Sequence, residues 1–219
     1  MEKKEELDKI ASEIAACKTC PLAKTATRPV PGNGSPNAEI MLIGEAPGYW
    51  EDQKGIPFVG AAGKLLDELL SSIDLTREDV FVTNVLKHRS PNNRDPLPEE
   101  IRACKPFLDR QIEIIQPRAI VTLGRFAMYH FLPEGKITRD HGQARKVQYS
   151  GREYLLIPMF HPAAALRNPE VEKQLREDFG RIPQEIKKQT EPPKPSGSGI
   201  TEFMTQPVEE KVEEQLFLI

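Results

Sequence analysis

The chain has 219 residues, enough for one well-buried domain with an appendage, and its net charge is −3. Residues 190–219 hold six acidic and two basic residues, so the other 189 residues carry a net +1, a balance that favours no class of partner. We find no signal peptide and no apolar run of membrane-spanning length, and three cysteines cannot all pair. We therefore expect a cytoplasmic protein without a disulfide framework.

Short apolar strands alternate with helices along the chain. In order, the hydrophobic periodicity predicts a helix over 4–16, a strand over 40–43, a helix over 61–73, a strand over 80–82, a helix over 98–115, strands over 119–123 and 154–157, and a helix over 170–187 that Pro183 interrupts. This alternation predicts a three-layer α/β/α fold around a central, mostly parallel, four-stranded sheet. The Pro, Lys, Ser and Gly residues of 190–199 predict a solvated linker, so we assign 1–189 to the domain and 190–219 to a flexible tail.

Three candidate segments each follow a predicted strand: the loop 44–48, Asn84 and His161. In open α/β sheets, binding sites lie beyond the carboxyl ends of the strands. We therefore expect these segments to meet in one site.

Four residues form a candidate metal site. Cys17 and Cys20 have C-x-x-C spacing, and His88 and Cys104 complete a set of soft or borderline ligands that suits a [4Fe–4S] cluster or zinc. The alternative is that Cys104 is a buried small hydrophobic residue and His88 a solvated loop residue.

The motifs occur in a characteristic order: the cysteine pair, Gly44-Glu45-Ala46-Pro47-Gly48, Thr83-Asn84, His88, Cys104 and His161-Pro162-Ala163. From about Cys17 to about Arg181 the chain resembles the family 4 uracil-DNA glycosylases, the iron–sulfur branch of that superfamily. The resemblance implies a [4Fe–4S] cluster of structural role, held by Cys17, Cys20, His88 and Cys104. Most of the family has cysteine at the position of His88, whereas a branch that traps uracil covalently has histidine there. That branch also has an inserted loop with a reactive histidine, and the short segment 89–96 has none.

The resemblance also implies roles in uracil binding and cleavage. Phe58 would stack on the flipped base, Asn84 would read its N3–H and O4, and His161 would donate a hydrogen bond to the developing O2 oxyanion. The imidazole could do this in its neutral or charged form. The structural alternatives are a core phenylalanine, an asparagine that caps a turn and a buried structural histidine.

The loop after the first predicted strand would supply the remaining groups of the pocket. Glu45 is its only ionisable residue and our candidate for positioning the attacking water or contacting the pyrimidine. Gly44 and Ala46 are the expected substrate-binding positions, and glycine allows close approach of the backbone. Other uracil glycosylases have an aspartate base at the place of Ala46.

Two further segments are candidates for binding DNA. Leu166 would wedge into the gap left by the flipped nucleotide, with Arg167 on a phosphate. Arg89 and Arg94 would contact phosphates from a second loop. Alternatively, Leu166 covers the core and the second loop is merely solvated.

The leading hypothesis is a monomeric, monofunctional glycosylase that hydrolyses the N-glycosidic bond of uracil in single- or double-stranded DNA. The alternatives are a uracil-binding or uracil-trapping protein of the same fold, and a non-catalytic, metal-stabilised nucleic-acid-binding module. At the end of the chain, Gln215, Leu216, Phe217, Leu218 and Ile219 resemble the peptide that binds the bacterial sliding clamp. The same residues could instead fold back onto the domain or mediate self-association.

Overall fold

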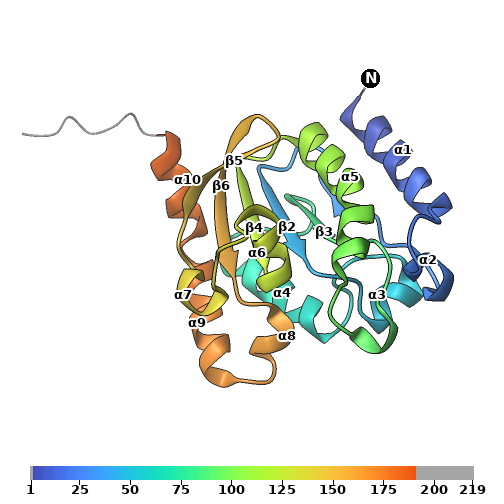
Figure 1. The fold of residues 1–219 in the computed structure, drawn as a ribbon. Coiled ribbons are helices and arrows are strands. Elements are labelled where there is room, and N and C mark those ends of the chain that lie inside the picture. Colours follow the sequence, from blue (N-terminus) through green and yellow to red (C-terminus); the bar gives the residue numbers. More distant parts are fainter. Residues whose placement is uncertain (1, 191–219) are drawn as a thin grey trace, which may run out of the picture.

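The structure is a computed structural model that describes residues 2–190. Its elements in chain order are α1 (Lys3–Ala16), α2 (Leu22–Thr25), β1 (Asn33–Gly34), β2 (Ile40–Gly44), α3 (Tyr49–Lys54), α4 (Ala61–Ser71), β3 (Val80–Asn84), a 3₁₀ turn (Pro91–Asn93), α5 (Pro98–Ile115), β4 (Ala119–Leu123), α6 (Arg125–Phe131), α7 (Ile137–Asp140), β5 (Arg145–Tyr149), β6 (Arg152–Met159), α8 (Pro162–Ala165), α9 (Pro169–Phe179) and α10 (Ile182–Thr190) (Figure 1). No helix within the described residues is both long and apolar enough to cross a membrane.

The sheet has six strands in the order β1-β3-β2-β4-β6-β5. Strands β3, β2, β4 and β6 are mutually parallel, which confirms the predicted parallel centre. The prediction of four strands was incomplete, because β1 and β5 add antiparallel edges. Strand β1 has only two residues, and β5 is partly exposed and largely polar, so neither has the continuous apolar run by which a buried strand is recognised.

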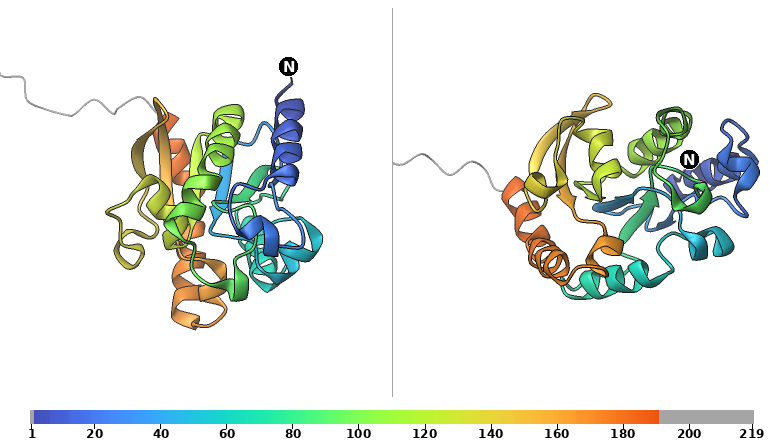
Figure 2. Two further views of the ribbon diagram at one scale, coloured as in Figure 1. Left: turned by 45° about the vertical axis from the view of Figure 1, so that its right-hand side comes forward. Right: turned by 60° about the horizontal axis from the view of Figure 1, so that its bottom comes forward.

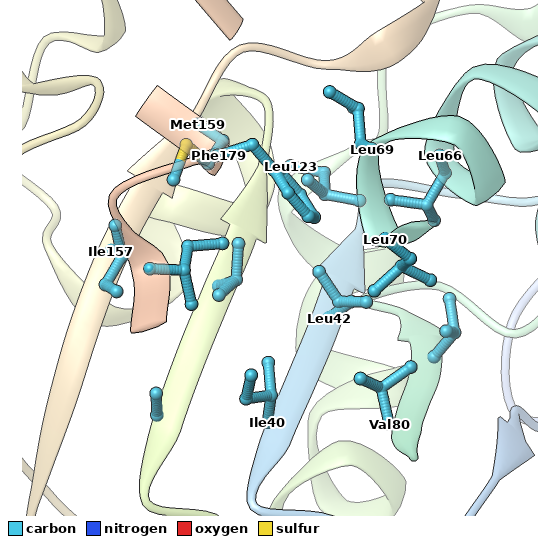
Figure 3. Close-up of a cluster of buried hydrophobic side chains, with 14 of the residues drawn as sticks. Ile40, Leu42, Leu66, Leu69, Leu70, Val80, Leu123, Ile157, Met159 and Phe179 are labelled. Atoms are coloured by element: carbon cyan, nitrogen blue, oxygen red, sulfur yellow. The ribbon is translucent and has the colours of Figure 1, made fainter. Parts of the chain in front are cut away.

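Helices cover both faces of this sheet, as the three-layer prediction requires. Figure 2 shows α4, α8, α9 and α10 on one face and α1, α5 and α6 on the other. Side chains alternate between the two layers: Leu42 of β2 joins the core beneath α4 and α9, whereas Met41 and Ile43 join the core beneath α5 and α6. In the first core, leucines of α4 and Phe179 of α9 lie over the strands (Figure 3).

The predicted helix over 170–187 is two helices. Helix α9 ends at Phe179, and α10 begins at Ile182 with Pro183 in its first turn. Proline is tolerated there because the first-turn N–H groups have no partner within the helix. The interruption predicted at Pro183 is therefore confirmed, although the break itself precedes the proline.

The register of the parallel strands brings the predicted site segments together. Gly44 at the end of β2 pairs with Asn84 at the end of β3, and Leu123 at the end of β4 pairs with Met159 of β6. The loop 45–48, the segment after Asn84 and His161 consequently leave the sheet at the same edge.

Candidate active site

A cavity of about 400 Å³ lies at this edge of the sheet. Seven of the residues predicted for catalysis, base binding or DNA binding line it: Glu45, Ala46, Phe58, Asn84, Arg94, His161 and Arg167. Gly44, Arg89 and Leu166 are not among the lining residues, and neither are the four candidate metal ligands. The structure thus separates the base pocket from the metal site.

Gly44 forms the floor on which two pocket side chains pack. A Cβ at this position would lie 2.4 Å from Asn84 Oδ1 and 2.7 Å from Phe58 Cζ. Any side chain there would displace both residues. Gly44 therefore shapes the pocket through the space it leaves free.

Asn84 presents an unsatisfied amide to the cavity. Its side chain is buried, and Oδ1 has no hydrogen-bond partner among the described residues. A buried acceptor without a partner costs on the order of 1–3 kcal/mol, so such a group is a strong candidate for binding a ligand.

Lys87 fixes the main chain of Asn84. The Lys87 ammonium is fully buried and donates to the Asn84 carbonyl at 2.8 Å, to Thr83 Oγ1 at 2.7 Å and to Gln111 Oε1 at 2.8 Å. Gln111 in turn donates to the carbonyl of Pro31 at 2.7 Å. This network fixes the end of β3, and it therefore fixes the main-chain position from which the Asn84 side chain extends.

Phe58 is held in an uncommon backbone conformation. Its φ is 53°, in the left-handed region, and Arg77 donates to its carbonyl at 2.8 Å. The Glu51 carboxylate accepts the N–H groups of Val59 and Gly60 at 2.8 and 3.0 Å, which fixes the chain on the other side. A Cβ at Gly63 would lie 1.8 Å from the Phe58 carbonyl oxygen, so α4 requires glycine there.

The Phe58 ring stacks on His161, with ring centroids 5.6 Å apart and planes at 25°. His161 is the N-cap of α8, and its Nδ1 accepts the Ala163 N–H at 3.0 Å. This bond assigns the ring proton to Nε2. Desolvation lowers the pKa of His161 to about 4, against a smaller opposing effect of Glu51. At neutral pH His161 is thus an uncharged hydrogen-bond donor, which resolves the choice that the sequence left open.

Glu45 has the opposite shift. Burial and, to a smaller extent, the Asp95 carboxylate raise the pKa of its carboxyl group to about 7, against an opposing effect of Arg125. A carboxylate with a pKa close to the ambient pH is well suited to accept a proton from water.

The candidate metal ligands lie on the other side of the loop 45–48. Cys20 and Cys104 are buried in one apolar cluster with Leu22 and Leu86, and Ala46 packs against this cluster. Burial raises the pKa of the Cys104 thiol; the Lys87 N–H lies 3.5 Å from its Sγ and opposes the shift, whereas Cys20 and Cys17 are near enough to add to it.

Cys17 is half-buried at the end of α1, and its Sγ lies 3.3 Å from Thr19 Oγ1. His88 is buried with Nδ1 unpartnered, and burial lowers its pKa. Within the described residues, no three His, Cys, Asp or Glu side chains stand in a metal-holding arrangement. The structure thus brings Cys20 and Cys104 together and leaves a buried imidazole with an unpartnered Nδ1 at position 88.

The residues predicted to contact DNA differ in whether their side chains already have a partner within the protein. Arg94 lines the pocket but forms two bonds, of 2.9 and 2.5 Å, to the buried Glu100. Arg89 Nε donates to Asn93 Oδ1 at 2.9 Å. Leu166 is exposed just after α8, and Arg167 beside it has no carboxylate partner among the described residues.

The sequence reasoning missed several residues that position the site. Lys87 had no usable signal, because it stands next to His88 and Arg89 and is typical of a solvated polar segment. Gln111, Glu51 and Arg77 had none either, since their partners lie in distant segments of the chain.

The sheet and its pocket define a class of protein: an α/β enzyme whose pocket is lined by an amide, a stacked aromatic ring, an uncharged imidazole and a carboxyl group with a pKa near neutrality. The sequence model of the uracil DNA glycosylase superfamily matches residues 31–181. A type-4 uracil-DNA glycosylase of Sulfurisphaera tokodaii is 52% identical over 80% of this chain and 83% of that protein. Those of Archaeoglobus fulgidus and Thermotoga maritima are 50% and 43% identical, covering 81% and 85% of this chain and 92% and 98% of theirs. The chain therefore belongs to the uracil-DNA glycosylase superfamily and, within it, to the type-4 family.

Proposed function

We propose that this protein excises uracil from DNA by hydrolysing its N-glycosidic bond, which leaves an abasic site for base excision repair. The observation that supports this most directly is the unpartnered amide of Asn84, which faces a pocket beside the stacked rings of Phe58 and His161. The type-4 membership of the chain agrees with it.

Recognition depends on the edge of the base. Uracil presents a donor at N3 and an acceptor at O4, which match the acceptor and donor of the Asn84 amide. Cytosine presents the reverse pattern. Reaching this edge requires a base flipped out of the stack, and Phe58 offers an apolar surface for the flipped ring.

Cleavage leaves negative charge on the departing uracil. The Nε2–H of His161 would donate to O2 as that charge develops, and desolvation strengthens the interaction. An uncharged imidazole suffices because the hydrogen bond of Nδ1 to Ala163 holds the donor tautomer in place. Glu45, as the carboxylate, would orient the water that attacks the sugar and accept its proton.

The direct test is release of free uracil from a uracil-containing oligonucleotide. The wild type should release uracil and leave an abasic strand, and His161→Ala should lose most of this activity. His141→Ala is the matched control, because His141 pairs with Asp178 and does not line the pocket. Retention of uracil on the protein would instead favour the trapping alternative. Covalent trapping would need a side chain that attacks the substrate, and His88, the candidate for that role, does not line the pocket.

We further propose that Cys17, Cys20, His88 and Cys104 hold a [4Fe–4S] cluster. Two buried thiols in one apolar cluster and the orphaned Nδ1 of His88 fit such a group, which would supply structural cross-linking of α1, the end of β3 and α5. Iron and sulfide analysis of anaerobically purified protein tests this, and bound zinc would contradict it.

The proposed clamp-binding peptide, Gln215 to Ile219, lies outside the described residues. A tether of this kind would raise the local concentration of the enzyme near replicating DNA. A 205–219 peptide should bind the host clamp, and the same peptide with Gln215→Ala and Leu216→Ala should not. Equal or absent binding of both peptides would remove this proposal. The monomeric state and the cytoplasmic location remain predictions.

A further inference from the structure

Two large aromatic side chains stand exposed directly after the pocket loop 45–48. Tyr49 and Trp50 are 52% and 57% exposed, and they open helix α3 directly after the pocket loop. Their neighbours on either side, Gly48 and Glu51, both line the cavity. Tyr49 and Trp50 do not line the cavity themselves, but they lie between two residues of the chain that do.

These rings are held in place. The Tyr49 and Trp50 rings meet edge to face, with centroids 5.1 Å apart. The guanidinium of Arg89 lies 5.3 Å from the centre of the Tyr49 ring and is bound through Nε to Asn93, which lines the pocket. This contact connects α3 to the loop 89–94, whose Asn93 and Arg94 line the pocket.

The base of the helix is fixed as well. Asp52 is buried and accepts the Thr27 N–H at 2.9 Å, and Glu51 binds the loop that bears Phe58. Trp50 also lies beside this loop, since a Cβ at Gly60 would meet Trp50 Cδ1 at 3.5 Å, an ordinary contact distance. The aromatic pair is thus exposed on a helix that the protein anchors, an arrangement with little use in folding alone.

We propose that Tyr49, Trp50 and Arg89 form a stacking platform for an unpaired nucleotide next to the flipped uracil, and that the preferred substrate is single-stranded DNA. An aromatic face stacks on any base, and a neighbouring guanidinium binds the phosphate that joins two nucleotides. In a duplex, the neighbouring base is already stacked and paired, so its face is not available to a protein ring. In a single strand it is available. This inference rests on the proposed function, since it places the nucleotide that flanks uracil.

The platform can be observed without catalysis, because Trp50 is the only tryptophan in the chain. A uracil-free, purine-rich single strand should quench its fluorescence. A strand of the same length whose nucleotides are replaced by abasic spacers should not, since it offers phosphates but no bases. Equal emission with both strands would overturn the proposal.

Excision provides the second measurement. The double variant Tyr49→Ala and Trp50→Ala should lose roughly tenfold or more in kcat/KM on a single strand with purines beside uracil, the size expected for removal of stacking. It should lose less than about twofold where spacers flank uracil, because nothing is then left to stack. Tyr129→Ala is the matched control, since Tyr129 is 40% exposed and its ring contacts Phe126 of α6 rather than Tyr49, Trp50 or Arg89.

The outcomes separate this proposal from the proposed function. If the wild type excises uracil and the double variant matches it on both substrates, the platform is refuted and the glycosylase activity stands. If DNA bases quench Trp50 but the wild type releases no uracil, the glycosylase proposal fails and the stacking surface stands. An unchanged melting temperature of the double variant verifies that the exposed rings contribute little to folding.

Discussion

Glu45 is placed where its charge is unfavourable to the fold, and the substitution Glu45→Gln should separate that effect from its role in the reaction. Burial raises the pKa of the folded carboxyl group from 4.5 to about 7. Between these two values the folded protein binds more protons than the unfolded chain. The free energy of unfolding therefore falls as the pH rises through this range, and it stays lower above it.

Glutamine has no charge to desolvate, so the variant should escape this loss. We expect Glu45→Gln to melt above the wild type at pH 8 and close to it below pH 4.5, where the wild-type carboxyl group is protonated. The Glu45 side chain is only partly buried, so solvent screening reduces the effect. A difference of about 1 kcal/mol would still raise Tm by roughly 2–4 °C.

The rate of uracil release should respond to pH in the opposite direction: it should rise as the pH rises. If the carboxylate is the base, the active fraction rises from about one tenth at pH 6 to about nine tenths at pH 8, nearly a tenfold gain in rate. The plot of rate against pH should show no second limb from His161 above pH 5, because the pKa of His161 is about 4. Glu45→Gln should lose on the order of 10²–10⁴ in rate and the pH dependence with it.

The assay is single-turnover release of uracil from a single-stranded oligonucleotide between pH 5 and 9, alongside thermal melting over the same range. Glu39→Gln serves as the control for loss of one carboxylate, because Glu39 is exposed and pairs only with Arg118 at the surface. A flat wild-type profile, or a Glu45→Gln variant that retains the wild-type rate, would refute the role as base. A Tm difference that does not change with pH would refute the burial argument.

Three further variants address neighbouring groups. Asn84→Asp should lower kcat/KM for uracil release on the order of a thousandfold, because it changes one of the two side-chain groups that would bond to the base. Iron content and Tm should stay near wild type. Near-wild-type excision would contradict this prediction. Lys87→Met should cost roughly 2–4 kcal/mol in urea unfolding, because three buried acceptors lose their donor. Lys146→Met, at the exposed ion pair with Glu153, should cost under about 1 kcal/mol. His88→Cys should keep iron and His88→Ala should lose it, as measured by metal analysis and visible absorbance; full iron content in His88→Ala would exclude His88 as a ligand.

Continuous runs of one residue class made much of the fold predictable. Helix α5 has the predicted limits because Pro98 starts it and its apolar face repeats with helical spacing, and β4 has the predicted limits because all five of its residues are buried. Strands β1 and β5 escaped prediction because edge strands need no apolar run on both faces.

The site was predictable in its location and much less so in its state. That Asn84 and His161 would meet follows from the ends of parallel strands. The tautomer of His161 depends on one hydrogen bond to Ala163, and the left-handed backbone of Phe58 depends on Arg77 and Gly63. Contacts of this kind join segments far apart in the chain, and no local sequence pattern predicts them.

Two of the four buried polar atoms without partners in the described residues belong to residues that line one cavity, and a desolvated carboxyl group lies there as well. The two residues are Asn84 and Ser90, and the carboxyl group is that of Glu45. Lys87 binds the Asn84 carbonyl through its ammonium and approaches Cys104 through its N–H. One residue thus connects the base-reading strand end to the candidate cluster ligands. A cluster that cross-links this segment to α1 and α5 would hold Asn84 in place without touching DNA, which is a physical reason for placing a structural metal site beside a pocket that must remain unsatisfied until uracil enters it.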